Sequence, residues 1–429
     1  MSEEKGSIGI IGKAGPTASA LRYYRMEVPL KGMEKLGVAH TFVDEGDGDR
    51  NEIVDATLNS DIVLAWRPVG VAGYEFVRNL ATLKPQAKDG HVIFPPIVIC
   101  DSDDAVDYVA PHNYVYSTLG IRNWDGSILK PGDKVTWTDV NGEEHVLWED
   151  GGDTRGQSGT KFDIARNLVT LGLHFDAMRR CHGITVSNQV LADHYREQIL
   201  LNEQNELRWS YPWLQPDIYV FPNSVVPEDY QWPNLAPHEG VRIIWEGGAS
   251  HMDSWFPIRH ALVKVLKENP EAKFVVFGAH FAWMKNEIPE GQLEIHAWKD
   301  YNIYKLTRTC LDADINLCPL TDSLFSRCKS AIRFYEASLG PRPEATLAAR
   351  VGPYGHEIIG DETGLVYDTV EEFVEKLTAL IKNADLRKRL GWAAQKWVLD
   401  NRTWEKTVPG LHDFYRETLS RHRQEIFKL

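Results

Sequence analysis

The stretch "WEGGASHMDSW" (245–255) follows a largely apolar run at 241–244 and precedes "FPIRHALVKVLKENP" (256–270). The apolar run predicts a buried strand, and the two glycines after it predict a turn. Apolar residues then recur at helical spacing. They are Trp255, Ile258, Leu262, Val265 and Leu266. A buried strand, a glycine turn and an amphipathic helix are typical of an α/β domain.

The same stretch has two functional interpretations. Ser250 and Asp253 have the spacing of a capping box, so the stretch could be a well-capped helix and nothing more. Alternatively, the turn leaves backbone amides and the positive end of the helix dipole at the carboxyl edge of the sheet, where a phosphorylated ligand could bind. The carboxylate of Asp253 opposes this second reading, because it would compete with a bound anion. These residues alone leave both readings open.

Short apolar runs followed by helix-period segments recur along the whole chain. In the first half they occupy 7–12, 40–45, 60–66, 92–100, 183–188 and 217–223. In the second half they occupy 241–247, 273–278, 292–298, 313–320 and 345–349. Strands that are apolar on both faces and alternate with helices indicate parallel sheets covered on both sides. The two series therefore predict two Rossmann-like, doubly wound α/β domains.

The Pro-rich stretch 226–240 lies between the two series and predicts a linker. We expect an N-terminal domain over 1–232, a C-terminal domain over 233–400 and a last helix within 401–429.

One segment, 132–152, breaks the alternation of strands and helices. Two alternating arms flank Asn141 and Gly142, a dipeptide that suits a tight hairpin turn. We expect a β-hairpin inserted in the N-terminal domain. It is either a decoration or has a role in acceptor binding or oligomerisation.

Composition narrows the class of protein. The 429 residues are 43% apolar and 25% charged, which is typical of a globular protein with two domains. The acidic start "MSEEKGSIGIIGK" is unlike a signal peptide, and no run approaches the roughly 20 apolar residues of a membrane span. The five cysteines are scattered without metal-type spacing, so we expect a cytoplasmic, reduced protein. The net charge of −14 disfavours nucleic acid as the main partner.

A second group of functional candidates lies in "DSLFSRCKSAIRFYEASLG" (322–340). Lys329, Arg333 and Glu336 follow one another at spacings of four and three, so they would share one helix face. The two cations suit phosphate oxygens, and the glutamate could accept hydrogen bonds from the vicinal hydroxyls of a ribose. The alternative is a salt bridge on a solvated face, although the neighbouring apolar residues favour a cleft.

Six ordered motifs give the chain a wider resemblance. They are "ITVSNQVLADHYRE" (184–197), "FPNSVVPEDYQWP" (221–233), "WEGGASHMDSWFPI" (245–258), "DADINLCPL" (312–320), "KSAIRFYEASLG" (329–340) and "VGPYGHEIIGDETGLV" (351–366). In this order they resemble the family-four-like retaining glycosyltransferases of the GT-B fold, and most closely a subgroup from bacteria and phages. The segment "RYYRMEVPL" (22–30) is similar to that family's N-terminal Tyr-Arg-x-x-x-Pro segment.

The resemblance implies two Rossmann-like domains facing each other across a cleft, with the last helix returning to the first domain. It implies transfer of a sugar from a UDP- or GDP-sugar to an acceptor hydroxyl with retention, without a metal or another cofactor. The leaving phosphate would itself accept the acceptor's proton. The acceptor, whether glycan, protein or modified nucleobase, and the oligomeric state are left open.

The resemblance also implies roles for individual residues. The donor site would contain Gly247, Gly248, Ser250, His251, Lys329, Arg333, Glu336, Tyr354 and Gly355. Among these, Lys329 and His251 would act directly on the reacting diphosphate, and Glu336 would contact the ribose. Cys328 stands where the family's Glu-x7-Glu motif has its first glutamate, so the donor-sugar contacts must differ. Asp322 is a possible substitute.

The acidic segment "CDSDDAVDY" (100–108) ends an apolar strand. Asp101 and Asp103 could form a metal-binding Asp-Ser-Asp motif, or the acidic residues could cap the next helix. In a third reading, Asp103 or Asp104 takes part in catalysis by positioning sugar or acceptor hydroxyls, with His112 assisting as an acceptor-binding residue.

Residues at the start of the first helix are the remaining acceptor-binding candidates. They are Arg22, Tyr23, Tyr24 and Arg25. The preceding Gly12-x-x-Gly15-Pro16 lacks the spacing of a dinucleotide fingerprint, so acceptor binding is favoured over a nicotinamide cofactor. Two other functions stay open: a phage-type DNA-base glycosyltransferase, and a non-catalytic nucleotide-sugar or glycan-binding protein.

Overall fold

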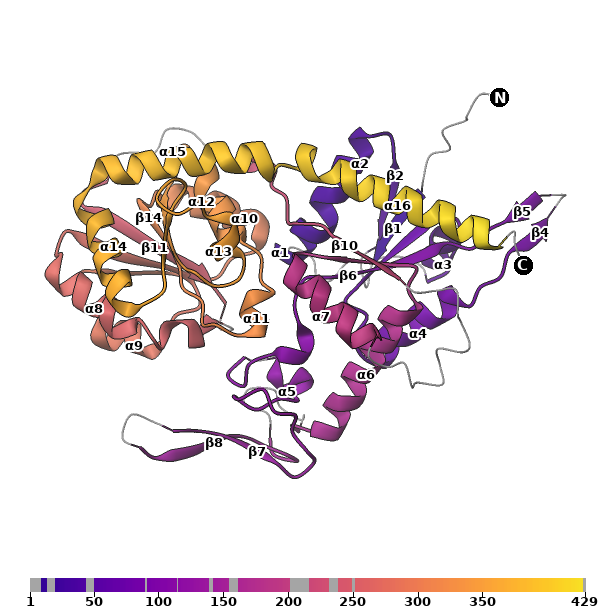
Figure 1. The fold of residues 1–429 in the computed structure, drawn as a ribbon, viewed down its shortest axis with the longest axis horizontal. Helices are drawn as coiled ribbons and strands as arrows, with labels where there is room; N and C mark the ends of the chain where they lie inside the picture. The colour runs from indigo at the N-terminus through magenta and orange to yellow at the C-terminus, as the bar shows by residue number, and fades with distance from the viewer. Residues whose placement is uncertain are drawn as a thin grey trace. The chain divides into compact units, whose positions relative to one another are not determined.

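The computed structural model describes residues 9–13, 20–43, 50–88, 91–113, 115–138, 142–153, 161–200, 216–230, 238–248 and 251–426. Contacts divide the chain into two compact units (Figure 1). The first unit comprises Met1–Asp104, Arg166–Ser224 and Trp404–Leu429, and the second comprises Ala105–Ala165 and Val225–Thr403.

The first unit is built on a six-stranded parallel sheet in the order β10-β9-β6-β3-β1-β2. The strands are β1 (Gly9–Lys13), β2 (Ala39–Val43), β3 (Ile62–Trp66), β6 (Ile97–Ser102), β9 (Gly183–Val186) and β10 (Asp217–Val220). The helices are α1 (Ala20–Arg22), the π-helix η1 (Tyr23–Glu27), α2 (Val28–Lys35), α3 (Arg50–Leu58), α4 (Gly70–Ala81), α6 (Ile164–Arg180), α7 (Gln189–Leu200) and α16 (Trp404–Ile426). The order of the first five strands along the chain, 2-1-3-4-5, is that of flavodoxin-like sheets.

The apolar run expected as one strand over 92–100 is two strands. The structure has β5 (His91–Ile93), paired antiparallel with β4 (Gln86–Lys88), followed by β6 in the main sheet. Pro95 and Pro96 lie between them and have no N–H to donate to a strand ladder, so the run is interrupted there.

The C-terminal helix α16 packs within the first unit, against α2. At the closest approach, a Cβ added to Gly32 would lie 2.9 Å from Cγ2 of Val408 and 3.0 Å from Cε3 of Trp404. The absence of a side chain at Gly32 therefore lets the two helices meet. Leu411 and Phe414 of α16 extend the contact into the core of the unit.

Two histidines meet where α16 covers the start of β9. The Nδ1 atom of His182 accepts a hydrogen bond of 3.0 Å from the backbone N–H of Val98. Its ring centroid lies 4.1 Å from that of His422. Burial lowers the pKa of His182 to about 3 and that of His422 to about 4, and the charges of Arg421 and Arg423 act in the same direction.

This pair predicts acid sensitivity of the folded chain. Because both folded-state pKa values lie below the ordinary value of about 6.5, the unfolded state binds more protons below pH 6.5. Stability should therefore fall as the pH drops from about 6.5 towards 4, by at most about 1.4 kcal/mol per pH unit for each histidine. Urea unfolding at pH 7 and pH 4.5 measures this loss. We expect His422→Phe to reduce this loss of stability. An unchanged loss would contradict the role given to the histidine pair.

The second unit has its own six-stranded parallel sheet, in the order β13-β12-β11-β14-β15-β16. Its strands are β11 (Val241–Gly247), β12 (Ala272–Gly278), β13 (Leu293–His296), β14 (Ile315–Cys318), β15 (Ala345–Ala349) and β16 (Leu365–Tyr367). Numbered along the chain, this is 3-2-1-4-5-6, the order of dinucleotide-binding Rossmann domains. The order reverses between β11 and β14, so a ligand crevice is expected at their carboxyl ends.

Helices cover both faces of the second sheet (Figure 1). They are α8 (Arg259–Glu268), α9 (Ala282–Glu287), α10 (Tyr301–Leu311), α11 (Leu324–Arg327), α12 (Ile332–Leu339), α13 (Pro353–Glu357), α14 (Val370–Lys382) and α15 (Ala384–Asn401). Helices α8 and α14 pack together, and α12 packs with α15. No helix in the described part of the chain has the length and apolar character needed to cross a bilayer. None of the five cysteines, all of which lie in the described ranges, forms a disulfide bond.

The hairpin consists of β7 (Lys134–Thr138) and β8 (Glu144–Glu149), paired antiparallel. Asn141 of the expected turn lies outside the described residues. The sequence-based division places 132–152 in the N-terminal domain, whereas the contacts group residues 105–165 with the second unit. The segment has a small core of its own, in which the rings of Tyr116, Trp148 and Phe162 meet at centroid distances of 5.4 to 5.6 Å.

Candidate functional site

Strand β11 ends at Gly247, at the switch point of the second sheet. A Cβ added to Gly247 would lie 2.7 Å from Nη2 of Arg333 and 3.0 Å from Cζ2 of Trp245. The guanidinium carbon of Arg333 lies 5.7 Å from the centroid of a Trp245 ring. Glycine at 247 therefore leaves the space through which the guanidinium of Arg333 reaches the end of β11.

Arg333 extends from the first turn of α12 and is partly exposed. Its Nη1 atom is buried and has no hydrogen-bond partner among the described residues. A guanidinium binds phosphate oxygens through parallel N–H bonds, and a buried donor without a partner is unfavourable until it finds one. The arrangement therefore suits an anionic ligand at the carboxyl end of β11.

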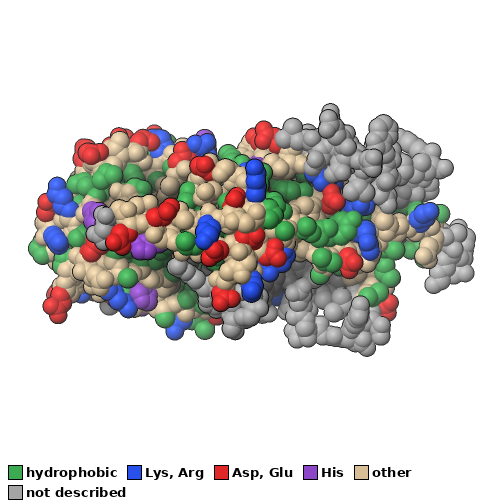
Figure 2. Space-filling view, turned by 90° about the horizontal axis from the view of Figure 1, so that it is seen from below, with side chains coloured by type: hydrophobic (Ala, Val, Ile, Leu, Met, Phe, Trp, Pro, Cys, Tyr) green, Lys and Arg blue, Asp and Glu red, His purple; other side chains and the backbone are tan. Residues whose placement is uncertain are grey.

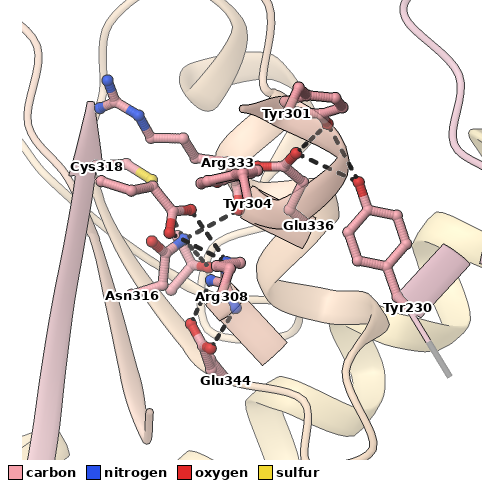
Figure 3. Close-up of polar contacts among 11 residues, drawn as sticks. Tyr230, Tyr301, Tyr304, Arg308, Asn316, Cys318, Arg333, Glu336 and Glu344 are labelled. Carbon is pink, nitrogen blue, oxygen red and sulfur yellow. Dashed lines mark hydrogen bonds and ion pairs between the residues drawn. The ribbon is translucent and has the colours of Figure 1, made fainter. Parts of the chain in front are cut away.

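Beneath this edge lies a buried cluster of charged side chains (Figure 3). Arg308 of α10 donates to both oxygens of Glu344, at 2.6 and 2.7 Å, and to Glu246 of β11, at 3.2 Å. Burial raises the pKa of Glu344 to about 7 and also raises that of Glu246, although the charge of Arg308 opposes both shifts. The cluster ties α10 and the start of β15 to the strand that carries Gly247.

Glu336 lies two-thirds of the way along α12 and is only 2% exposed. Its Oε1 accepts hydrogen bonds from the hydroxyls of Tyr301 (2.6 Å) and Tyr230 (3.3 Å), and its Oε2 accepts one from Tyr304 (2.8 Å) (Figure 3). The alternative of a solvated salt bridge is therefore wrong for Glu336. A ribose hydroxyl could reach this carboxylate only by sharing it with a tyrosine or displacing one.

The structure corrects the position of Lys329. Helix α11 ends at Arg327 and α12 begins at Ile332, so Lys329 lies in the connection and not on one continuous face with Arg333 and Glu336. Its Nζ lies 4.1 Å from the centroid of the Phe325 ring.

Cys328 and Asp322 precede Lys329 in the chain. Cys328 is fully buried, and the exposed Asp322 accepts two hydrogen bonds from Arg327. The carboxylate of Asp322 is therefore engaged with a protein partner.

The loop expected to approach the donor through its amides forms α13, which follows β15 at the same edge of the sheet. Tyr354 is buried beside Cys318 of β14, and burial raises the pKa of its hydroxyl. Burial is the main cause that raises the pKa of Cys318 to about 12. The side chain of Tyr354 is therefore part of the interior, and any ligand contact of Tyr354 and Gly355 would come from their backbone.

The stretch quoted at the outset folds differently from the expectation. Ser250 lies outside the described residues. Residues Asp253–Trp255 form the 3₁₀ turn η6, and α8 begins only at Arg259. Pro257 has no N–H with which to continue an α-helix from the carbonyl of Asp253, so the regular helix starts beyond it. The backbone N–H of His251 donates to the carbonyl of Gly248 at 3.2 Å.

Solved structures were compared with this fold. Sucrose-phosphate synthase from Thermosynechococcus elongatus is 8% identical, with 97% of this chain and 100% of that chain covered and a TM-score of 0.55. A glycosyltransferase from Rickettsia africae is 14% identical, with 96% and 99% covered and a TM-score of 0.55. HepE from Anabaena, solved with UDP and glucose, is 8% identical, with 96% and 100% covered and a TM-score of 0.53. The chain has the GT-B fold. Neither a protein-family model nor a curated protein sequence matches it.

In the first GT-B unit, Arg25, one of the expected acceptor-binding residues, is surrounded by protein partners. It is buried and donates to both oxygens of Asp101, at 3.0 and 2.6 Å. It also donates to the carbonyl of Phe221 and to Oδ1 of Asn223. These bonds join η1 to the ends of β6 and β10.

The three residues before Arg25 are also buried or paired with a protein side chain. Tyr23 and Tyr24 are buried, and Arg22 pairs with Glu27 at 2.9 Å.

The two aspartates expected to take part in catalysis are joined by a residue that the sequence did not indicate. Arg67, directly after β3, donates to Asp103 at 2.8 Å and pairs with Asp104. Its φ of +37° is uncommon for a residue other than glycine. Burial alone would lower the pKa of Arg67, but the charges of Asp103 and Asp104 raise it.

Both aspartates of the Asp-Ser-Asp motif, which could form a metal site, have protein partners. Asp101 is engaged by Arg25 and by the hydroxyl of Thr185 at 2.6 Å, and Asp103 is engaged by Arg67. The described residues contain no cluster of three or more potential metal ligands.

Proposed function

We propose that this chain is a retaining glycosyltransferase that moves a sugar from a nucleoside-diphosphate sugar to an acceptor hydroxyl. The observation that carries the proposal is the guanidinium of Arg333 beside Gly247, with an unpartnered Nη1 at the switch point of a Rossmann sheet. Open α/β sheets bind ligands at that point. The GT-B neighbour HepE was solved in complex with UDP and glucose. We therefore favour uridine and guanosine diphosphate sugars as donors.

In the proposed reaction, the bond between the sugar's anomeric carbon and the diphosphate oxygen breaks. A new bond forms from the same carbon to the acceptor oxygen, on the same face of the ring. The acceptor's proton passes to the departing phosphate oxygen. Arg333 would stabilise the negative charge that develops on the leaving group, with Lys329 and the backbone N–H groups after β11 assisting.

The charge pattern disfavours a nucleic-acid partner. On the face shown in Figure 2, the Lys and Arg side chains of the described residues are interspersed with Asp and Glu side chains. Together with the net charge of −14, this pattern gives a DNA-base acceptor no support on this face.

A donor panel tests the proposal. UDP- and GDP-linked sugars are added to the protein with and without EDTA, and the melting temperature and the slow hydrolysis of donor are measured. A ligand that binds only the folded state must raise the melting temperature. We expect one donor to do so in EDTA and to be hydrolysed. Binding without hydrolysis or transfer would indicate a non-catalytic binding protein, and no shift with any donor would contradict the proposal.

Retention has its own test. Once an acceptor is known, the anomeric proton of the product is compared with that of the donor by NMR. The same anomeric configuration in both is expected, and the opposite configuration would replace retention with inversion.

A further inference from the structure

A pair of exposed aromatic rings lies in the second unit, outside the residues assigned to the donor. Trp124 is 45% exposed and Phe256 is 50% exposed. Both contact the same histidine: the ring of His112 stacks on Trp124 at 5.6 Å and 17°, and meets Phe256 edge-on at 6.3 Å and 69°. We call Trp124, His112 and Phe256 the aromatic platform.

The platform is held firmly by its neighbours. Trp255, the residue before Phe256, is fully buried and packs edge-on against Trp245, which anchors this part of the chain in the interior. The carbonyl of Asp253 accepts a hydrogen bond of 2.9 Å from Thr321, which fixes η6 to the segment after β14. A ligand would therefore meet a site whose residues are already ordered.

Trp124 is fixed independently of η6. Its Nε1 donates to the carbonyl of Thr136 in β7 at 2.7 Å, so the ring is held by its edge while one face stacks on His112. The exposed area of Trp124 then remains for contact with a ligand.

A buried histidine and a partly exposed carboxylate lie at the platform. The side chain of His112 is only 3% exposed, and neither ring nitrogen has a hydrogen-bond partner among the described residues. Its Nε2 lies 3.3 Å from Oδ1 of Asp253, within ion-pair distance but without hydrogen-bond geometry. The carboxylate of Asp253 is 19% exposed. A ligand hydroxyl could donate to this carboxylate.

We propose that the aromatic platform binds a pyranose ring of a carbohydrate acceptor. The apolar C–H face of the sugar would pack on Trp124 and Phe256, and a sugar hydroxyl would bind Asp253. This inference rests on the proposed glycosyltransferase function, because η6 directly follows the loop assigned to the donor diphosphate. The carboxylate of Asp253 beside His112 opposes a phosphorylated ligand and favours a neutral one.

The test uses saturation-transfer NMR and titration with methyl α- and β-glycosides of glucose, galactose, mannose and N-acetylglucosamine. We expect at least one glycoside to bind the wild-type protein, and Trp124→Ala and Phe256→Ala to weaken that binding about tenfold or more. Trp124→Phe should retain part of the affinity for the glycoside that Trp124→Ala loses. Trp137→Ala is the matched control, because Trp137 is also 45% exposed but stacks on His145 of the hairpin. It should bind like the wild type, and all variants should keep the wild-type melting temperature.

The outcomes separate this inference from the proposed function. Donor binding without any glycoside binding would overturn the platform and leave the donor site intact. Glycoside binding that needs Trp124, in a protein that binds no nucleotide sugar, would support the platform and overturn the transferase. An equal loss in Trp137→Ala would overturn the assignment to Trp124. Self-association that Trp124→Ala abolishes, without glycoside binding, would show that the platform is a contact between copies.

Discussion

Arg333→Ala should weaken binding of the donor found in the panel by about tenfold and slow its hydrolysis by about a hundredfold. Removing the guanidinium takes away hydrogen bonds to the diphosphate in the ground state, and more of them as charge develops on the leaving group. Calorimetric titration gives the dissociation constant, and the release of nucleoside diphosphate gives the rate.

Two controls sharpen this experiment. Arg333→Lys keeps the charge but loses the planar fork, so its rate should lie between those of the wild type and the alanine variant. Arg389→Ala removes an exposed arginine of α15 that donates to the carbonyl of Asp361, and should leave donor binding unchanged. If Arg333→Ala bound the donor as tightly as the wild type does, Arg333 would not belong to the donor site.

Arg308→Met should lower the free energy of unfolding by about 3 to 5 kcal/mol at pH 8, because it leaves Glu246 and Glu344 buried without their cation. The loss should shrink as the pH falls. The folded-state pKa of Glu344 is already raised to about 7, and without Arg308 it rises further, so at lower pH the carboxyl is protonated and neutral. Urea unfolding of the second unit at pH 8 and pH 6 measures both effects.

The matched control for Arg308→Met neutralises its partners as well. A triple variant with Glu246→Gln and Glu344→Gln should recover part of the stability at pH 8, because no uncompensated charge remains buried. A single variant with wild-type stability at both pH values would contradict the role given to the cluster.

Much of the fold follows from local sequence patterns. The runs at 241–247 and 345–349 are mostly apolar, and each is a central or inner strand of the second sheet. The five apolar side chains that recur at helical spacing from Trp255 to Leu266 are all buried. These patterns succeed because strand and helix periods directly reflect which side chains must leave water.

Other features depend on tertiary contacts that no local pattern encodes. The spacing of Lys329, Arg333 and Glu336 predicts one helix face, but the break between α11 and α12 removes Lys329 from it. Tyr230, which hydrogen-bonds Glu336, lies more than a hundred positions earlier in the chain.

The first unit also contains a contact that no local pattern predicts. Arg67 follows an unremarkable strand, and only the parallel pairing of β3 with β6 brings it to Asp103 and Asp104. A positively charged residue after a neighbouring strand is a weak signal, because surface arginines are common at such positions.

The most direct test of the account is a crystal structure of the protein with the nucleoside diphosphate of the donor that the panel identifies. We predict that the diphosphate lies at the carboxyl ends of β11 and β14, with its oxygens within hydrogen-bond distance of the Arg333 guanidinium and of the backbone after Gly247. A diphosphate bound away from Arg333, for example at the end of β3 beside Arg67, would contradict it.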